Sequence, residues 1–383
     1  MYSEGKVEEK FVKSGGNGNG TKDSPIGKIS DAYDKLNGDT SSTSYIITII
    51  KQEDGQPALV AGVNTFDKEK PLMIQGKQNE GANGTPELVE INCTYLTEGG
   101  SISGSSDHSS MTTNTNKLSP NLTISTCQFV RPTETGTANI HLVKVEAGEF
   151  NMEAVSFSDD NNTAKFSTTP FLFDKATKVT LIASTLNNIE SSASAVVKIG
   201  GNNSEKIEVN VHGCTFTNCK STEASNATSG ALYVESNGTD STFNISESPR
   251  YSNAKTTFTS CECANGKSGG IYLKMSAISN ANQLTWSEED KLTVSGCKAG
   301  SDKQTFLYLD VNSEKLQDIA KAMKEKFAKN YVKGTNDWFV AAKGTNSEGE
   351  DIDFTAVYFD PHEAYVKNGG SDDTADGTKT KPF

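Results

Sequence analysis

A short internal repeat constrains the fold of this chain more than any other sequence feature. The motif Phe-Thr-x-Cys begins at Phe216 and again at Phe258, and each copy is followed by a Gly-rich turn and an aliphatic strand. The cysteines Cys219, Cys261 and Cys297 mark equivalent points, spaced by 42 and then 36 residues. Between these points the chain has room for three short runs of alternating polar and apolar residues. Three strands per repeat predict a parallel β-solenoid.

The strand after each Gly-rich turn indicates which side chains face the core. Leu232 and Val234, like their counterparts in the next two repeats, are expected to stack as aliphatic ladders. Tyr233, Tyr272 and Tyr308 alternate with these residues and fall on the opposite face. We expect an exposed aromatic row there, as a strip for sugars or for a neighbouring molecule. The alternative is that aromatic side chains simply favour strands and stack laterally.

The repeated cysteines end equivalent strands, so they are expected to stack. Cys219, Cys261 and Cys297 would lie about one coil spacing apart, which is within reach of a disulfide. The chain has seven cysteines, so at least one stays free if no partner chain contributes. The alternative is that these cysteines are small hydrophobic side chains buried at a tight turn.

A second, longer repeat joins the two ends of the chain. Residues 365–370 repeat residues 11–16, and after a three-residue insertion residues 377–379 and 382–383 repeat residues 20–22 and 25–26. This match predicts one full repeat followed by the opening of the next, so the expected partners are copies of the chain itself, head to tail. The expected assembly interface consists of Tyr365, Val366, Pro382 and Phe383 together with Trp338 and Phe339.

The internal repeat resembles a known family of surface proteins. Phe216-Thr217-Asn218-Cys219 with Ser229-Gly230-Ala231-Leu232 is similar to the FxxN and GGA(I/L/V) motifs of the polymorphic outer-membrane protein adhesins. Phe258-Thr259-Ser260-Cys261 with Gly269-Gly270-Ile271 repeats the pattern, with Cys where that family has its final Asn. The resemblance implies a right-handed parallel β-helix with an adhesive or surface-coating role.

The opening of the chain is similar to that of pectin-lyase-like β-helices. There a short strand and a Gly-rich loop lead into a helix that covers the open end of the solenoid. The counterparts in this chain are residues 11–25, a helix over Lys28 to Leu36 and a strand over Tyr45 to Ile50. The resemblance implies that the helix is a cap, which removes an exposed sheet edge.

The expected organisation has four parts. Residues 1–44 hold the opening motif and the capping helix, and residues 45–311 form the β-helix. Residues 312–364 form a small helix-and-strand junction, since Ser313 is a good helix N-cap and two strand-like runs follow. Residues 365–383 begin the next tandem repeat.

Charge and hydropathy exclude several kinds of partner. The net charge is −13, and arginine occurs only at Arg131 and Arg250, which argues against nucleic-acid and anionic-membrane partners. No apolar run reaches the ~20 residues that span a bilayer, so this segment is not expected to insert into a membrane. The high content of Ser, Thr, Asn and Gly favours an extracellular or cell-surface protein.

Two kinds of modification or ligand remain open. Asn-x-Ser/Thr sequons are candidate N-glycosylation sites, and they occur at Asn19, Asn83, Asn92, Asn121, Asn161, Asn202, Asn226, Asn237 and Asn244. Asp372 and Asp376 precede Gly377 with the alternate oxygen spacing of calcium loops, although Gly/Asp turns without metal have the same composition. No other metal or cofactor is expected.

Enzymatic signatures are absent from the sequence. Asp159-Asp160 lies in a polar stretch with no His or Arg in a matching coil position, and His212-Gly213 fits a strand-edge histidine. We therefore expect a non-enzymatic, structural repeat unit of an extracellular or cell-surface fibre or adhesin, assembled head to tail. The alternative is a carbohydrate-binding or carbohydrate-processing β-helix, with glycans or a host or neighbouring cell surface as partner.

Overall fold

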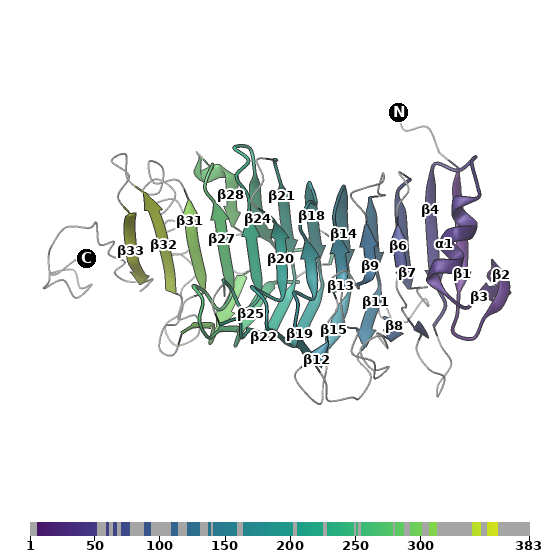
Figure 1. Ribbon diagram of the computed structural model, residues 1–383, viewed down its shortest axis with the longest axis horizontal. Coiled ribbons are helices and arrows are strands. Elements are labelled where there is room, and N and C mark those ends of the chain that lie inside the picture. Colours follow the sequence, from purple (N-terminus) through teal and green to yellow (C-terminus); the bar gives the residue numbers. More distant parts are fainter. Residues whose placement is uncertain are drawn as a thin grey trace, which may run out of the picture. The chain divides into compact units, whose positions relative to one another are not determined.

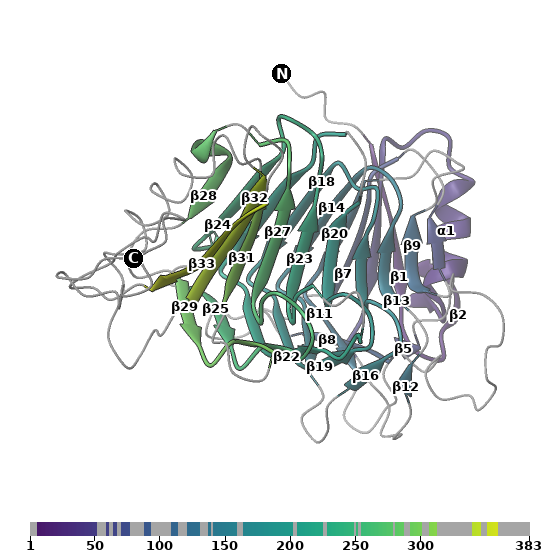
Figure 2. The same ribbon diagram turned by 60° about the vertical axis from the view of Figure 1, so that its left-hand side comes forward.

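The structure is a computed structural model that divides into two compact units, Met1–Asn188 and Ile189–Phe383. It describes residues 6–51, 59–60, 64–66, 70–76, 88–92, 109–113, 121–130, 137–138, 141–158, 164–201, 205–224, 228–248, 250–251, 254–278, 280–286, 292–300, 306–311, 339–345 and 351–358. In what it describes, the regular secondary structure is almost entirely strand, in mostly parallel sheets stacked in layers (Figures 1 and 2).

The first unit contains three sheets. Sheet A comprises, in spatial order, β2 (Asn17–Thr21), β3 (Ser24–Ile26), β1 (Val7–Val12), β4 (Ser44–Ile49), β7 (Leu72–Gly76), β10 (Leu122–Ser125), β14 (Glu149–Glu153) and β18 (Lys178–Ile182). Sheet B comprises β5 (Leu59–Val60), β8 (Val89–Asn92), β11 (Cys127–Val130), β15 (Ser156–Ser158) and β19 (Thr185–Ser191), with β12 (Thr137–Ala138) pairing to β16 (Ala164–Phe166). Sheet C comprises β6 (Asn64–Phe66), β9 (Ser109–Thr113), β13 (His141–Val145) and β17 (Phe171–Phe173).

From β4 onward, each pass of the chain adds one strand to sheets A, B and C in turn. Neighbouring strands pair in parallel and in a constant register, as in Leu122 opposite Phe150 and Phe150 opposite Val179. The side chains at these positions are fully buried. Alternation within each strand, and not a long apolar run, therefore creates the core.

Helix α1 (Ile29–Asn37) is the one α-helix among the described residues, within one residue at each end of the predicted cap. Ile29, Ala32, Tyr33 and Leu36 are buried and pack against β1, β3, β4 and β6. The Tyr33 ring meets Phe66 of sheet C edge to face, with centroids 4.9 Å apart. The helix therefore covers the apolar start of the unit, as expected of a cap.

The second unit also contains three sheets. Sheet D comprises β21 (Glu208–His212), β24 (Thr242–Ser246) and β28 (Leu284–Trp286), which the short 3₁₀ helix η2 (Ala281–Gln283) precedes. Sheet E comprises β22 (Thr215–Ser221), β25 (Thr256–Thr259) and β29 (Leu292–Ser295), with β26 (Glu262–Cys263) and β30 (Lys298–Ala299) beyond a corner. Sheet F comprises β20 (Val197–Gly200), β23 (Leu232–Glu235), β27 (Ile271–Met275), β31 (Leu307–Val311), β32 (Phe339–Thr345) and β33 (Asp351–Tyr358).

The expected ladders form the core of the second unit. Leu232, Ile271 and Leu307 pair in register, and all three are fully buried. The region expected to be a separate junction differs, because β32 pairs in parallel with β31 and so extends sheet F. Strand β33 then pairs antiparallel with β32, which ends the parallel order. The helix expected from Ser313 lies outside the described residues.

Residues with left-handed backbone form the corners between strands. In sheet E, Asn218, Ser260 and Gly296 have φ of 50°, 52° and 63°, and each directly precedes one of the repeated cysteines. In the first unit, Thr126, Ala154 and Ala183 take the same conformation where sheet A leads into sheet B, with φ of 52°, 49° and 46°. Such φ values are unfavourable for Thr and Ala, so neighbouring coils must hold these corners in place.

The core packing of sheet E yields a testable prediction. Phe258 is fully buried, stacks on Phe216 with centroids 4.6 Å apart and contacts Phe306. Phe258→Ala should therefore lower the free energy of unfolding by about 3–5 kcal/mol, measured by urea denaturation. Thr259→Ala, on the outward face of the same strand, should change it by less than about 0.5 kcal/mol. Equal losses in the two variants would contradict the assignment of the inward face.

Candidate assembly site

The opening motif, residues 11–26, folds into a compact strand and hairpin. Val12 at the end of β1 pairs with Ile26 of β3, and both side chains are buried. The Lys13 N–H donates to the Ile26 carbonyl (2.9 Å), and the Gly16 N–H donates to the Lys13 carbonyl (3.0 Å). Strand β2 turns back antiparallel to β3. The motif is therefore held by backbone hydrogen bonds around one buried apolar pair.

Four glycines in this motif occupy positions that exclude other residues, and a Cβ on one of them, Gly18, would clash with the Ser24 carbonyl. Gly15 and Gly20 have φ of +70° and +94°, a backbone conformation that residues other than glycine rarely adopt. A Cβ on Gly16 would lie 2.6 Å from the Pro25 carbonyl oxygen. The backbone conformation and close packing of the hairpin therefore require glycine at these positions.

The C-terminal copy, residues 365–383, repeats the residues on which the hairpin depends. Gly369, Gly370 and Gly377 match Gly15, Gly16 and Gly20, three of the four required glycines, while the copy has no glycine at the position of Gly18. Val366 and Phe383 match the buried pair Val12 and Ile26. Tyr365, Val366, Pro382 and Phe383 lie outside the described residues, as does Trp338. Phe339 opens β32, where it pairs with Tyr358 of β33.

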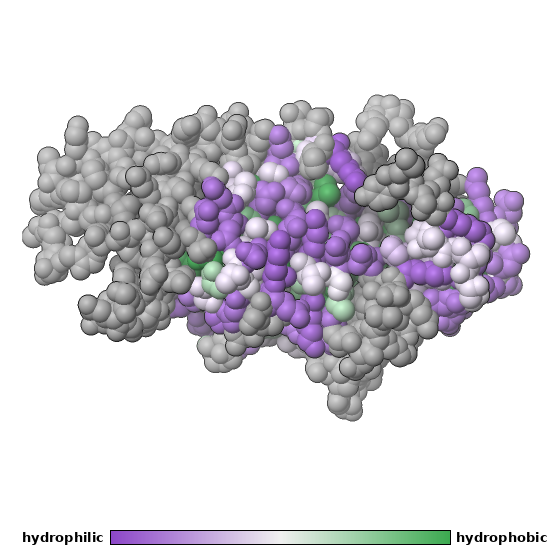
Figure 3. Space-filling view, turned by 90° about the horizontal axis from the view of Figure 1, so that it is seen from above, coloured by the Kyte–Doolittle hydropathy of each residue, from purple (hydrophilic) through white to green (hydrophobic). Residues whose placement is uncertain are grey.

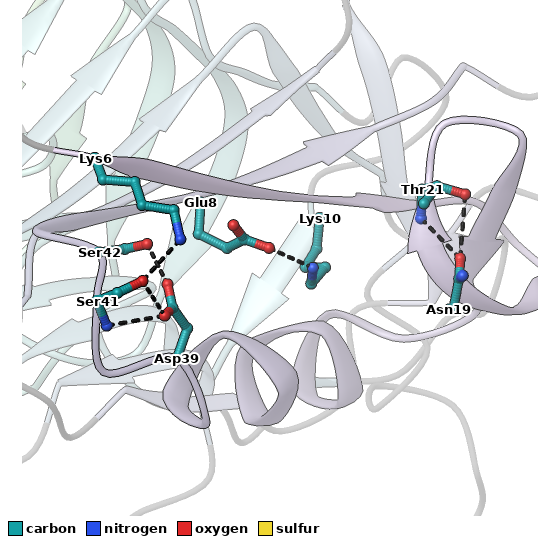
Figure 4. A network of polar contacts seen from close by, with 8 residues as sticks. All are labelled: Lys6, Glu8, Lys10, Asn19, Thr21, Asp39, Ser41 and Ser42. Carbon is teal, nitrogen blue, oxygen red and sulfur yellow. Dashed lines mark hydrogen bonds and ion pairs between the residues drawn. The ribbon is translucent and has the colours of Figure 1, made fainter.

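A polar network ties the loop after α1 to the first strand (Figure 4). The Asp39 carboxylate accepts hydrogen bonds from the Ser42 hydroxyl, the Ser41 hydroxyl (2.7 Å) and the Ser41 N–H (2.9 Å). The Lys6 ammonium donates to the Ser41 hydroxyl (2.7 Å). These donors, the Ser42 hydroxyl above all, hold the pKa of Asp39 well below its usual range.

The Asp39 backbone also joins the network. Its carbonyl accepts hydrogen bonds from the Tyr45 hydroxyl (3.1 Å) and from the Lys70 ammonium (2.8 Å), which lies over the Tyr45 ring. Asp39 therefore links α1, β1 and β4. Sequence reasoning missed this residue, although Asp39-Thr40-Ser41-Ser42 has the composition of an Asx turn.

The row of tyrosines exists, but the expectation that it is exposed is wrong. Tyr233, Tyr272 and Tyr308 pair in register on sheet F, with ring centroids 5.1 and 5.0 Å apart. They are only 6–8% exposed. The Tyr272 hydroxyl donates to Asp310 (3.0 Å), and the ammonium of Lys267 lies over the Tyr308 ring. Burial chiefly, with nearby carboxylates, raises the pKa of Tyr233 and Tyr272.

A column of alternating charge runs beside the tyrosines and was also missed. Glu235, Lys274 and Asp310 occupy consecutive register positions. The Lys274 ammonium lies 2.7 Å from the Glu235 carboxylate. The alternation is visible only once the register of these three strands is known.

The repeated cysteines stack as expected, as buried thiols and not as disulfides. The six cysteines that the structure describes are free and buried, while Cys93 lies outside the described residues. Cys261 contacts both Cys219 and Cys297. Burial raises the pKa of Cys261, and it raises the pKa of Cys127 to about 12. The structure therefore agrees with the alternative prediction, in which these cysteines are small hydrophobic side chains buried at a turn.

The sequons differ in their surroundings. Asn19 and Asn121 are exposed, and Asn19 accepts a hydrogen bond from Thr21. Asn244 lies within β24 and donates its amide to Asn210 (3.3 Å), while Asn237 accepts from Ser276 (2.6 Å). Asn92 lies within β8. The other sequons, Asn83, Asn161, Asn202 and Asn226, lie outside the described residues, as do the calcium candidates Asp372 and Asp376.

Comparisons with protein-family models, with curated proteins and with solved structures give no match to this chain. In the described part of the chain, no helix has the length and apolar character needed to cross a bilayer. What the chain does must therefore be inferred from its own residues.

The required glycines lead to a prediction about the opening motif. Gly16→Ala would place a Cβ against the Pro25 carbonyl, which should open the hairpin and lower hydrogen-exchange protection of the Lys13 amide by roughly tenfold or more. Gly38→Ala is the matched control, because its Cβ would meet nothing closer than 3.5 Å and its φ is −73°. Unchanged protection in Gly16→Ala would refute the packing described for this turn.

The Asp39 network leads to a prediction about pH. The folded-state pKa of Asp39 lies below the value of about 3.9 for an unfolded chain, so its stabilising contribution is complete above that value and is lost as the pH falls through the folded pKa. Ser42→Ala should raise the pKa of Asp39, as measured by carboxyl carbon NMR titration. Ser30→Ala, which removes a hydroxyl bonded to Asp31, should leave it unchanged. The assignment fails if both variants titrate like the original protein.

Proposed function

We propose that this chain is a structural unit of an extracellular or cell-surface fibre or adhesin, assembled head to tail with copies of itself. The observation that carries the proposal is the C-terminal copy. It keeps glycine at three of the four positions where the N-terminal hairpin requires it, and apolar residues at two positions that the hairpin buries.

The proposed architecture is a right-handed parallel β-helix, of the kind the resemblance to surface adhesins implies. Parallel pairing in constant register supports it, as does the order in which the chain visits its three sheets within each unit. In such a solenoid each coil is stabilised by its neighbours, so a rod can be extended by adding units. The proposed role is mechanical and presentational, without catalysis.

The surface of the described residues fits a polar, hydrated rod. It is largely hydrophilic in the view of Figure 3. Among the described residues, Val7 is the one large hydrophobic side chain that is exposed. The carbohydrate-binding alternative loses its main support, because the tyrosines that would stack on sugars are buried.

Deletion of the C-terminal copy tests the proposed assembly. Removal of residues 364–383 should abolish end-to-end assembly, seen by electron microscopy and sedimentation, while circular dichroism still reports the β-sheet signal. Val366→Asp should have the same effect, because it places a charge at the position of buried Val12.

Lys379→Ala is the control, because it matches exposed Lys22 and should leave assembly intact. End-to-end assembly that persists after the deletion would overturn the proposed role of this segment. A rod that never assembles, even with the segment present, would contradict the head-to-tail proposal itself.

A further inference from the structure

Two rows of hydroxyl groups cover the outward face of sheet E. Thr215, Thr257 and Thr293 pair in register as the first row, on β22, β25 and β29. Thr217, Thr259 and Ser295 pair in register as the second row, two residues further along each strand. The residues between them, Phe216, Phe258 and Val294, are buried. The two rows therefore lie on the outward face of sheet E, while the inward face of the same sheet packs in the core.

These hydroxyls are not used by the fold. All six residues are partly or fully exposed. Within the described part of the chain, none of their hydroxyl groups has a hydrogen-bond partner. The polar rows of sheet D differ, because Asn244 donates to Asn210 and Asn210 donates to Glu208. The hydroxyls of sheet E thus remain available to a ligand.

The two rows consist of neutral side chains, although the chain has a net charge of −13 and exposed Lys255 directly precedes β25. The neighbouring charged column, Lys220, Glu262 and Lys298, lies beyond the corner at the repeated cysteines. Lys220 and Glu262 there form an ion pair with 3.8 Å between nitrogen and oxygen. Neutral hydroxyl rows offer little to an ionic ligand, and a neutral lattice of hydrogen-bonding groups is a better match for them.

The geometry of the rows is regular in two directions. Neighbouring strands are ~4.8 Å apart, and residues two apart along a strand are ~6.6 Å apart. The spacing between strands is close to one repeat of oxygen atoms in hexagonal ice, and the spacing along a strand is somewhat shorter than another. Threonine is stiff at χ1, so its hydroxyl and methyl groups are held in place before any contact is made, at little cost in entropy.

We propose that this face of sheet E binds ice, with the hydroxyl rows anchoring an ordered layer of water that joins the crystal. Water bridges of this kind are nearly as favourable as direct hydrogen bonds. The inference is independent of the proposed assembly, since every residue in it lies within one unit. A crystalline polysaccharide is the competing ligand, but sugar-binding faces generally present aromatic rings, and the tyrosines of this unit are buried on sheet F.

The test is the growth of ice in the presence of the purified full chain. The original protein should shape ice crystals and slow their recrystallisation. Thr257→Lys, at the centre of the first row, should lose most of this activity, because a charged and mobile side chain breaks both rows. Thr285→Lys is the matched control, since Thr285 is an exposed threonine on sheet D. Circular dichroism and thermal melting establish that both variants fold.

Two results would overturn the proposal. The first is that the folded original protein leaves ice growth unchanged, or that Thr257→Lys is as active as the control. The second is that the protein pellets with crystalline cellulose, loses this binding in Thr257→Lys and has no effect on ice, which would assign the face to sugar hydroxyls instead.

Discussion

In-register stacking of one parallel strand on the next is the interaction on which this structure depends. Leu232, Ile271 and Leu307 meet because their strands pair without offset, and the same pairing aligns Tyr233 with Tyr272 and Tyr308 on the other face. A slip of one residue would exchange the buried and outward sets, so every buried ladder favours the same register. Core, outward rows and corner positions all follow from this single constraint.

The corners explain why the repeated cysteines are present without being cross-linked. A left-handed residue turns the strand sharply, and the next side chain then points into a narrow interior space. Cys219 and Cys261 fill that space as buried thiols, each directly after such a residue. A thiol is small and apolar enough for the position, and burial suppresses its ionisation. The spacing of the repeated cysteines therefore reflects the number of residues in each coil and does not indicate a set of disulfides.

Alternation and repetition in the sequence were sufficient to predict the parallel strands and the aligned tyrosines, while the capping helix was expected from the resemblance of the opening motif to other β-helices. They could not predict the burial of the tyrosines, because that depends on groups from other positions, such as Asp310 and Lys267. The corners at Thr126 and Ala183 have no sequence signal at all, since neither residue favours a positive φ. Which side chains of a strand face inward can be predicted from the sequence of that strand. Burial and corner conformation depend on contacts among several strands, and they cannot be predicted in this way.

A ladder of stacked strands has two ends, and each exposes unpaired backbone groups and apolar side chains to water. At the start of the first unit, β1, the hairpin of β2 and β3, and α1 provide the cover, with Tyr33 packed on Phe66. The C-terminal copy repeats the sequence of the strand and hairpin part of that cover, including three of its four glycines. Head-to-tail assembly would thus solve the problem of the open end with a motif the chain already uses, and the interaction that holds neighbouring coils together would also join neighbouring units.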